Sequence, residues 1–213
     1  MSRSKESFRK NPVFRLIPLR EIVAFSSVLF FIAGCTSSYT PKPRGYFKII
    51  FPERSYQHFD NGMCPFAFDY PKYGVINRDT VFLDTVPDNA CWLNITFPSL
   101  NGNLYLSYKE IKDKNSLRKL IEDSHKLTFK HTVKADFIDE NILHTPNHVS
   151  GVLYDVGGNA ASALQFFVTD STKHFLRGSL YFYNTPNADS IAPVVQFLRP
   201  DILKLISTLQ WKD

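Results

Sequence analysis

The chain has 213 residues, a formal net charge of +5 and a sequence pI near 9.0, values that at first suggest a nucleic-acid-binding protein. The first 34 residues, however, hold six of the basic residues and only two of the acidic ones, so the remainder carries 19 basic and 18 acidic side chains. The chain also has no basic cluster interleaved with aromatic residues, and we do not expect it to bind nucleic acid.

The N-terminal segment has the pattern of an export signal. Basic residues predominate up to Arg20, and an apolar run follows from Ile22 to Ala33. A helix needs roughly 20 apolar residues to span a bilayer, so this shorter run is typical of a secretory signal peptide. The run ends in "IAGC", which resembles the bacterial lipobox of an aliphatic residue, two small residues and a cysteine. The alternative is a buried hydrophobic helix that contains a cysteine by chance.

A lipobox implies that Cys35 receives a diacylglyceryl group and fatty-acyl chains such as palmitate, and that the chain is cut just before it. We therefore predict a lipoprotein signal peptide over residues 1–34 and a membrane-anchoring lipid on Cys35. Residues 35–44 are polar and contain prolines, so they are expected to form a flexible tether. Residues 45–213 are then expected to form a single globular α+β domain.

Two cysteines remain in the predicted domain, Cys64 and Cys91. An even number in an exported chain favours a disulfide. That bond would close a loop of about 27 residues, which the chain-entropy model values at about 3.5 kcal/mol. The alternative is a pair of buried free thiols. Neither cysteine has another Cys or a His at ligand spacing, so we expect no metal site and no cofactor.

Most of the domain has the pattern of β-strands. Phe, Tyr and Trp make up 15% of the chain, and aromatic and β-branched residues favour strands. In "CPFAFDYP", Phe66, Phe68 and Tyr70 alternate on one face, as strand residues do. The predicted strands cover residues 45–52, 64–71, 81–86, 91–98, 102–111, 135–146 with a turn, 148–158 with a turn, 161–170 and 175–184. The last two, joined by "STKH", form the clearest hairpin.

Two regions have a helical period instead. Residues 115–130 predict an amphipathic helix capped by Asn115 or Ser116 and lying on a sheet. Its predicted stripe consists of Leu117, Leu120, Ile121, Ser124 and Leu127.

The end of the chain predicts a helix capped by Asp189 or Ser190, with Pro193 in its first turn. Pro200 should break or kink this helix, and a second short helix should follow. The residues that the second helix is expected to bury are Ile202, Leu203, Ile206 and Leu209.

Strands, a helix, further strands and closing helices together predict an α+β fold, an antiparallel β-sheet with helices packed on it. This order, with the aromatic strands and the terminal "ILKLISTL" helix, resembles the PsbP/Mog1-like sandwich. No tandem repeat interrupts the pattern, which agrees with a single domain.

Three longer segments carry a closer resemblance. They are "PKPRGYFKIIFPERSYQHFDNGMCPFAFDYPKYGVI", "CWLNITFP" and "GNAASALQFFVTDSTKHFLRGSLYFYNTPNADSIAPVVQFLRPDILKLISTLQW". They resemble the gliding-motility lipoprotein GldD family of Bacteroidota over essentially the whole mature chain. The resemblance implies an envelope lipoprotein that is required for surface gliding and works alongside the type 9 secretion apparatus. It implies no enzymatic activity and no cofactor.

The resemblance also implies a side of the membrane and a modification. Surface-exported lipoproteins of that phylum carry acidic residues soon after the lipidated cysteine, whereas residues 36–39 contain none, which indicates the periplasmic side. The phylum O-glycosylates Asp-Ser/Thr followed by an apolar residue or Thr. The matching candidates are Thr80, Thr85, Ser171 and Ser190. For Ser190 the alternative is a helix cap.

No catalytic motif occurs in the sequence. Neither Gly-x-Ser-x-Gly nor His-Glu-x-x-His is present. His144 and His148 are four residues apart, but "HTPNH" predicts a turn rather than a zinc-binding helix. Asp69, Asp84 or Asp155 could belong to a carboxylate pair, although any chain with 20 acidic residues offers such pairs.

The preferred hypothesis is therefore a lipid-anchored, non-catalytic periplasmic protein that binds other envelope proteins and supports the gliding and secretion machinery. One alternative is an envelope enzyme that acts on peptidoglycan or glycan through a carboxylate pair. A third is a module that holds a lipid or a sugar in a deep apolar pocket. Exposed aromatic or apolar surface would favour the first hypothesis.

Overall fold

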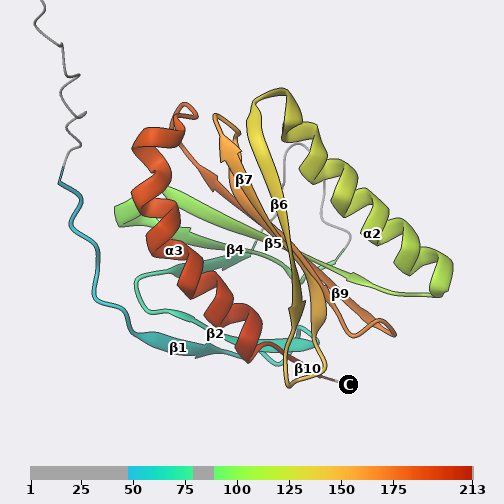
Figure 1. Ribbon diagram of the computed structural model, residues 1–213. Helices are drawn as coiled ribbons and strands as arrows, with labels where there is room; N and C mark the ends of the chain where they lie inside the picture. The colour runs from blue at the N-terminus through green and yellow to red at the C-terminus, as the bar shows by residue number, and fades with distance from the viewer. Residues whose placement is uncertain (1–47, 79–88, 213) are drawn as a thin grey trace, which may run out of the picture. The chain divides into compact units, whose positions relative to one another are not determined.

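Two antiparallel sheets and two long helices make up the part of the protein that the computed structural model describes, residues 48–78 and 89–212 (Figure 1). The smaller sheet has the strand order β1-β2-β10, and the larger sheet has the order β3-β4-β5-β9-β8-β7-β6. All neighbouring strands are antiparallel. The fold is therefore α+β, as the sequence predicts.

The strands are β1 (Tyr56–Phe59), β2 (Phe66–Pro71), β3 (Val75–Arg78), β4 (Trp92–Phe97), β5 (Gly102–Glu110), β6 (Ala135–His144), β7 (Ser150–Gly158), β8 (Ser162–Thr169), β9 (His174–Phe182) and β10 (Gln210–Trp211). The helices are α2 (Lys114–Phe129) and α3 (Ala188–Thr208), with the short 3-10 helices η1 (Pro98–Leu100) and η2 (Lys130–Val133). The strands predicted within residues 64–71, 91–111 and 135–184 are all present.

One crossover explains the strand order of the larger sheet. The chain leaves β5, passes through α2 and η2, and re-enters the sheet at its far edge as β6. It then returns strand by strand through β7 and β8, and β9 pairs with β5. This path lays α2 across one face of the sheet and leaves β6 as an edge strand.

The two faces of the larger sheet are buried by different helices. On β7, Leu153 belongs to the core that includes α3, whereas Tyr154 and Val156 belong to the core under α2. Because successive strand residues point to opposite faces, α2 and α3 cover opposite faces of the sheet. The predicted stripe of α2 is wrong at Leu127, which is 41% exposed.

Both helices begin at caps other than the predicted ones. The Asp113 carboxylate accepts the Ser116 N–H (2.7 Å), and the Ser116 hydroxyl accepts the Asp113 N–H (3.0 Å), which makes a capping box for α2. The side-chain oxygen of Asn187 accepts the Ser190 N–H (3.2 Å) and caps α3. Each cap lies upstream of the predicted residues, because a cap must precede the turn whose N–H groups it satisfies.

The prediction that Pro200 separates two helices is wrong, because α3 is continuous from Ala188 to Thr208. A proline inside a helix removes one backbone donor and crowds the preceding turn. In that turn the Arg54 guanidinium donates to the carbonyl of Phe197 (2.7 Å). A tertiary contact thus ties the turn that precedes Pro200 to the segment before β1.

The first predicted strand, residues 45–52, is absent from its described part, and β1 begins at Tyr56. Phe51 instead stacks on Phe197 of α3, with ring centroids 4.4 Å apart. Packing against a helix, rather than strand pairing, therefore explains the apolar pattern of this segment. The strand predicted over residues 81–86 lies outside the described residues.

Candidate functional site

The N-terminal half of α3 leaves a groove between itself and the larger sheet, which we call the α3 groove. The helix presents Ala188 and Ala192 to the sheet, and β7 presents Gly157 and Gly158 to the helix. These small residues leave a cavity of about 270 Å³, because they cannot fill the space that separates a helix from a sheet. The other apolar residues of its lining are Phe137, Val156, Ala163, Ile191 and Val195.

Phe137 forms the rim of the groove. It is paired with Gly157 in the β6–β7 ladder, where an added Cβ would lie 2.1 Å from its ring. Only glycine leaves room for the ring over the strand at this position. Phe137 is nevertheless 53% exposed, so a large apolar surface remains in solvent at the mouth of the groove.

One end of the groove is charged. Arg199 donates to both carboxylate oxygens of Asp155, at 3.0 Å from Nε and 2.8 Å from Nη, and this bond raises the pKa of Arg199. Asn141 also donates to Asp155 (3.0 Å). Asp139 is paired with Asp155 across the ladder, is exposed and forms no ion pair within the described residues. The apolar groove therefore ends at a neutralised ion pair, and the unneutralised carboxylate of Asp139 lies next to that pair on β6.

The groove borders the free edge of β6. This strand ends the larger sheet, so no strand of the described part pairs with its outer side. Most of its side chains are exposed, including Ile142 at 76%. Its ionised residues are acidic: Asp136, Asp139 and Glu140. Strand edges of this kind accept a further strand from a partner.

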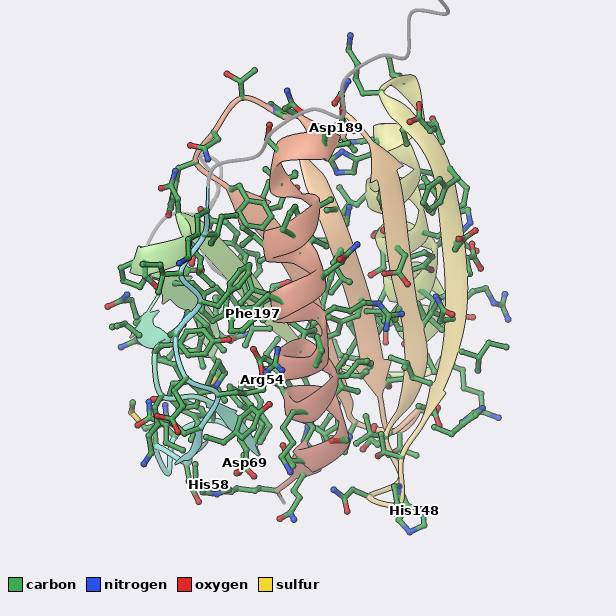
Figure 2. The ribbon with its side chains drawn as sticks, turned by 60° about the vertical axis from the view of Figure 1, so that its left-hand side comes forward. Arg54, His58, Asp69, His148, Asp189 and Phe197 are labelled. Carbon is green, nitrogen blue, oxygen red and sulfur yellow. A yellow bond between two sulfur atoms is a disulfide. The ribbon has the colours of Figure 1, made fainter. Side chains whose placement is uncertain are left out.

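The C-terminal half of α3 carries a different polar cluster, which we call the Asp201 clasp. Asp201 is 1% exposed, and its carboxylate accepts hydrogen bonds from Arg54 (3.0 Å), from the Tyr56 hydroxyl (2.7 Å) and from the Tyr73 hydroxyl. The Arg54 guanidinium also lies over the Phe197 ring, 4.7 Å from its centroid, and Figure 2 shows the two side chains beside the middle of α3.

The two tyrosine hydroxyls of the clasp have raised pKa values. Burial and the hydrogen bond to Asp201 raise the pKa of Tyr56 to about 12, and the same two causes raise the pKa of Tyr73. Both hydroxyls therefore remain donors at neutral pH. Since the buried carboxylate has three partners, we assign the clasp a structural role, which is to fasten the segment before β1 to α3.

Comparison with known proteins decides the family. The family model of the gliding motility lipoprotein GldD matches residues 36–211. The chain belongs to the GldD family. A solved structure similar to it is the cyanobacterial PsbP protein (CyanoP) from Synechocystis sp. PCC 6803, with 13% identity, a TM-score of 0.43, and coverage of 75% of this chain and 94% of that one. A similarity at this level says nothing about function. The comparison with curated proteins found no match.

Membership of the GldD family makes this chain a gliding motility lipoprotein, and the resemblance to that family is confirmed. The predicted lipidation site, Cys35, lies outside the described residues, as do Thr80 and Thr85. Ser171, in the β8–β9 turn, and Ser190, in the first turn of α3, are both exposed. Glycosylation at these positions stays a prediction. Within the described residues, no helix is long and apolar enough to cross a membrane.

Cys64 and Cys91 are joined by a disulfide, with their Cα atoms 5.5 Å apart. Both are buried, at 3% and 6% exposure. The bond connects Cys64, two residues before β2, to Cys91, the residue just before β4, and so links the smaller sheet to the larger one.

Of the carboxylates considered for catalysis, the two that the structure describes, Asp69 and Asp155, lie on different sheets. Asp69 pairs with His58 on the smaller sheet, with Nδ1 and Oδ1 2.8 Å apart, and Figure 2 shows the pair near the C-terminal end of α3. Asp155 lies on the larger sheet, and Asp84 lies outside the described residues. His148 is at the tip of the β6–β7 hairpin, and no metal-binding cluster occurs in the described part of the chain.

Sequence reasoning did not find the α3 groove or the Asp201 clasp. Both contain a local signal that is visible in retrospect. Gly157 and Gly158 are the last two residues of a strand, and glycine in a strand often marks a close approach of another group. Asp201 is a lone acid within an apolar helical run, where a buried charge requires partners from elsewhere in the chain.

Proposed function

We propose that this GldD-family protein is held by lipid on Cys35 at the periplasmic side of the cell envelope, and that it supports gliding motility and the associated type 9 secretion machinery by binding another envelope protein. It acts without catalysis and without a cofactor. The family match supports the motility role, and the lipobox at "IAGC" supports the anchor.

The observation that carries the binding role is the α3 groove beside the free edge of β6. A cavity of about 270 Å³ is smaller than the roughly 300–1,000 Å³ typical of small-molecule sites, which disfavours a lipid or sugar pocket. It can take one apolar side chain of a partner. The backbone groups of β6 can at the same time pair with the segment that carries this side chain.

The charges beside the groove define that segment further. Asp139 is unneutralised within the described residues, and Asp136 and Glu140 are also acidic. We therefore infer that the occupant is an extended segment of a partner protein, with an apolar side chain for the groove and a Lys or Arg opposite Asp139. Complementary charge across an interface favours one register and one partner over others.

Site-specific photocrosslinking in intact cells tests the binding role. A photoreactive phenylalanine analogue at Phe137 should give a discrete adduct with one envelope protein, and Asp139→Lys should reduce its yield. The matched control is the same analogue at Leu127, which is exposed on the opposite side of the sheet. No adduct at Phe137, or equal adducts at both positions, would count decisively against the proposal.

Metabolic labelling with a fatty-acid analogue tests the anchor separately. The native chain should be labelled and fractionate with membranes, whereas Cys35→Ala should lose the label and be released. A labelled Cys35→Ala protein would show that the lipid is attached elsewhere.

The alternative of an envelope enzyme keeps one observation in its favour, since Asp139 and Asp155 are paired across the β6–β7 ladder. Against it, the Asp155 carboxylate is held by Arg199 and Asn141. The lipidated protein should therefore leave purified peptidoglycan intact. Turnover that Asp155→Asn abolishes would establish the enzyme and overturn the non-catalytic role.

A further inference from the structure

A second cavity, away from the α3 groove, has an unusual set of charges. It has a volume of about 370 Å³ and lies where η2, the β7–β8 turn and the loop before α3 meet. Its lining includes Lys130, His131 and Lys134 from the η2 region, and none of its described lining residues is acidic. We call it the η2 pocket.

Its basic side chains are not neutralised by neighbours. Lys130, His131 and Lys134 form no ion pair with any described residue. The nearest acids along the chain, Asp136 on β6 and Asp189 in the first turn of α3, do not line the pocket. The uncompensated positive charge of the two lysines, gathered in a concave site, attracts anions.

The positive charge of Arg177, which lies behind the pocket, adds to the positive charge of the two lysines. The Arg177 guanidinium on β9 is partly buried, and its hydrogen bond goes to a neutral acceptor, Gln165 Oε1 (2.5 Å). Its charge reaches the pocket: burial lowers the pKa of His131, and Arg177 lowers it further. The His131 ring also lies 6.4 Å from the Tyr181 ring, which connects the pocket to the same face of the sheet.

Polar groups on this face have unused hydrogen-bonding capacity. Ser179 and Gln165 are 0% and 1% exposed, yet Ser179 Oγ and Gln165 Nε2 have no hydrogen-bond partner among the residues that the structure describes. The two residues are paired across the β8–β9 ladder, directly beside Arg177. Neither residue lines the η2 pocket, so this pair marks a polar interior behind the site and does not itself contact a ligand there.

The neutral residues of the pocket present donors. The Ala188 N–H donates to Asn159 Oδ1 (2.9 Å), and this bond orients the side-chain amide so that its NH₂ group is left for a ligand. Thr185 adds a hydroxyl to the lining. The N-terminus of α3, beginning at Ala188, contributes the positive end of its dipole close by.

We propose that the η2 pocket binds a phosphate group. A phosphate has several acceptor oxygens around one centre, so it can accept hydrogen bonds from both lysines and from the Asn159 amide at once. The same chemistry is available from a phosphorylated headgroup of an envelope lipid and from a free phosphate. This site is separate from the α3 groove and does not depend on the proposed partner.

Phosphorus NMR on the full lipidated protein in a neutral detergent tests this site. One arm titrates inorganic phosphate, and the other adds phosphatidylglycerol to the micelles, with diacylglycerol as the phosphate-free control. The test variant is Lys130→Gln/Lys134→Gln, and the matched variant is Lys126→Gln/Lys173→Gln, which removes the same charge from exposed positions outside the pocket.

The native protein should bind in at least one arm with saturation. The test variant should lose about tenfold or more in affinity, and the matched variant should stay within about twofold. Binding in the first arm alone identifies a free phosphate, and binding in the second alone identifies a lipid headgroup. No saturable binding in either arm, or equal binding by all three proteins, would overturn the site.

Discussion

The two halves of α3 (Ala188–Thr208) are held very differently. The buried residues of its C-terminal half are Leu198, Asp201, Ile202, Leu205 and Ile206. In the N-terminal half of this helix, Val194 alone is buried, at 8% exposure, and Ala192 faces the α3 groove. We call the C-terminal half of α3, which is buried against the core, the sealed half, and the N-terminal half, which borders the α3 groove, the open half.

The difference follows from what each half packs against. The C-terminal half packs on β2 of the smaller sheet, and the Asp201 clasp binds the segment before β1 to it. The N-terminal half faces the larger sheet where Gly157 and Gly158 provide no side chains. We therefore expect substitutions in the sealed half to change the free energy of unfolding, and substitutions in the open half to change binding.

Removing the disulfide should have the largest effect on stability. The Cys64–Cys91 bond has a sequence separation of 27, for which the chain-entropy model gives about 3.5 kcal/mol. Because the bond ties β2 to the larger sheet, Cys64→Ala/Cys91→Ala should weaken the support of the sealed half first. Chemical denaturation measures the total loss, and hydrogen exchange along α3 measures its distribution. Equal loss of protection from hydrogen exchange in both halves of α3 would contradict the expectation that the disulfide supports the sealed half first.

Removing the Asp201 carboxylate of the clasp should have the second-largest effect on the free energy of unfolding. Asp201→Ala leaves Arg54 and the Tyr56 and Tyr73 hydroxyls without their acceptor, and we expect a loss of about 2–3 kcal/mol in the free energy of unfolding. The value lies below the roughly 3–5 kcal/mol of a fully buried ion pair because the Arg54 side chain is 39% exposed. Asp123→Ala, on the exposed surface of α2, is the control and should cost less than about 0.5 kcal/mol.

The clasp also predicts a response to alkaline pH. Between pH 10 and 12 an unfolded tyrosine has lost its proton, whereas folded Tyr56, with a pKa raised to about 12, keeps it. The folded state then binds more protons than the unfolded state, so the stabilisation is complete below pH 10 and is lost as the pH rises through 12. Across this pH range the free energy of unfolding, measured by chemical denaturation, should fall less steeply with pH for Tyr56→Phe/Tyr73→Phe. An unchanged slope in that variant would place the titrating groups outside the clasp.

The sealed half shows what the sequence could and could not predict. Burial of Ile202 and Ile206 follows from helical period alone, and the structure confirms both. Continuity through Pro200 contradicts the local rule, and the contact that holds the preceding turn, from Arg54 to the Phe197 carbonyl, joins residues 143 positions apart. Local rules describe an isolated helix, and tertiary contacts can override them.

The open half was harder to predict for a related reason. Alternation and turn residues are local, so the β8–β9 hairpin was predictable from "ASALQFFVTD" and "FLRGSLYFYN". The groove depends on which strand lies under which turn of α3, and the Arg199–Asp155 pair spans 44 positions. No pattern within a short window contains that information.

Removing the cap of α3 should have a smaller effect, confined to the open half. Asn187→Ala deletes the acceptor of the Ser190 N–H and should cost about 1 kcal/mol. Fraying of the first turn should also lower the yield of the Phe137 adduct, because Ala188 and Ile191 line the groove. The matched variant is Asp113→Ala, which removes the cap of α2 at a similar cost and should leave the adduct unchanged. Loss of the adduct in both variants would point to general destabilisation.

Filling the groove should separate binding from stability most clearly. Ala192→Leu places a larger side chain in the cavity of about 270 Å³, where space is available, so the free energy of unfolding should change by less than about 0.5 kcal/mol. The same side chain would occupy the position of the partner's apolar residue, and the Phe137 adduct should fall by about tenfold. Ser207→Leu introduces the same leucine side chain on the exposed surface of the sealed half, at the loss of the Ser207 hydrogen bond to the Lys204 carbonyl, and should preserve the adduct. If Ala192→Leu crosslinks as well as the native chain, the open half of α3 is not where the partner binds, and the free edge of β6 alone must account for it.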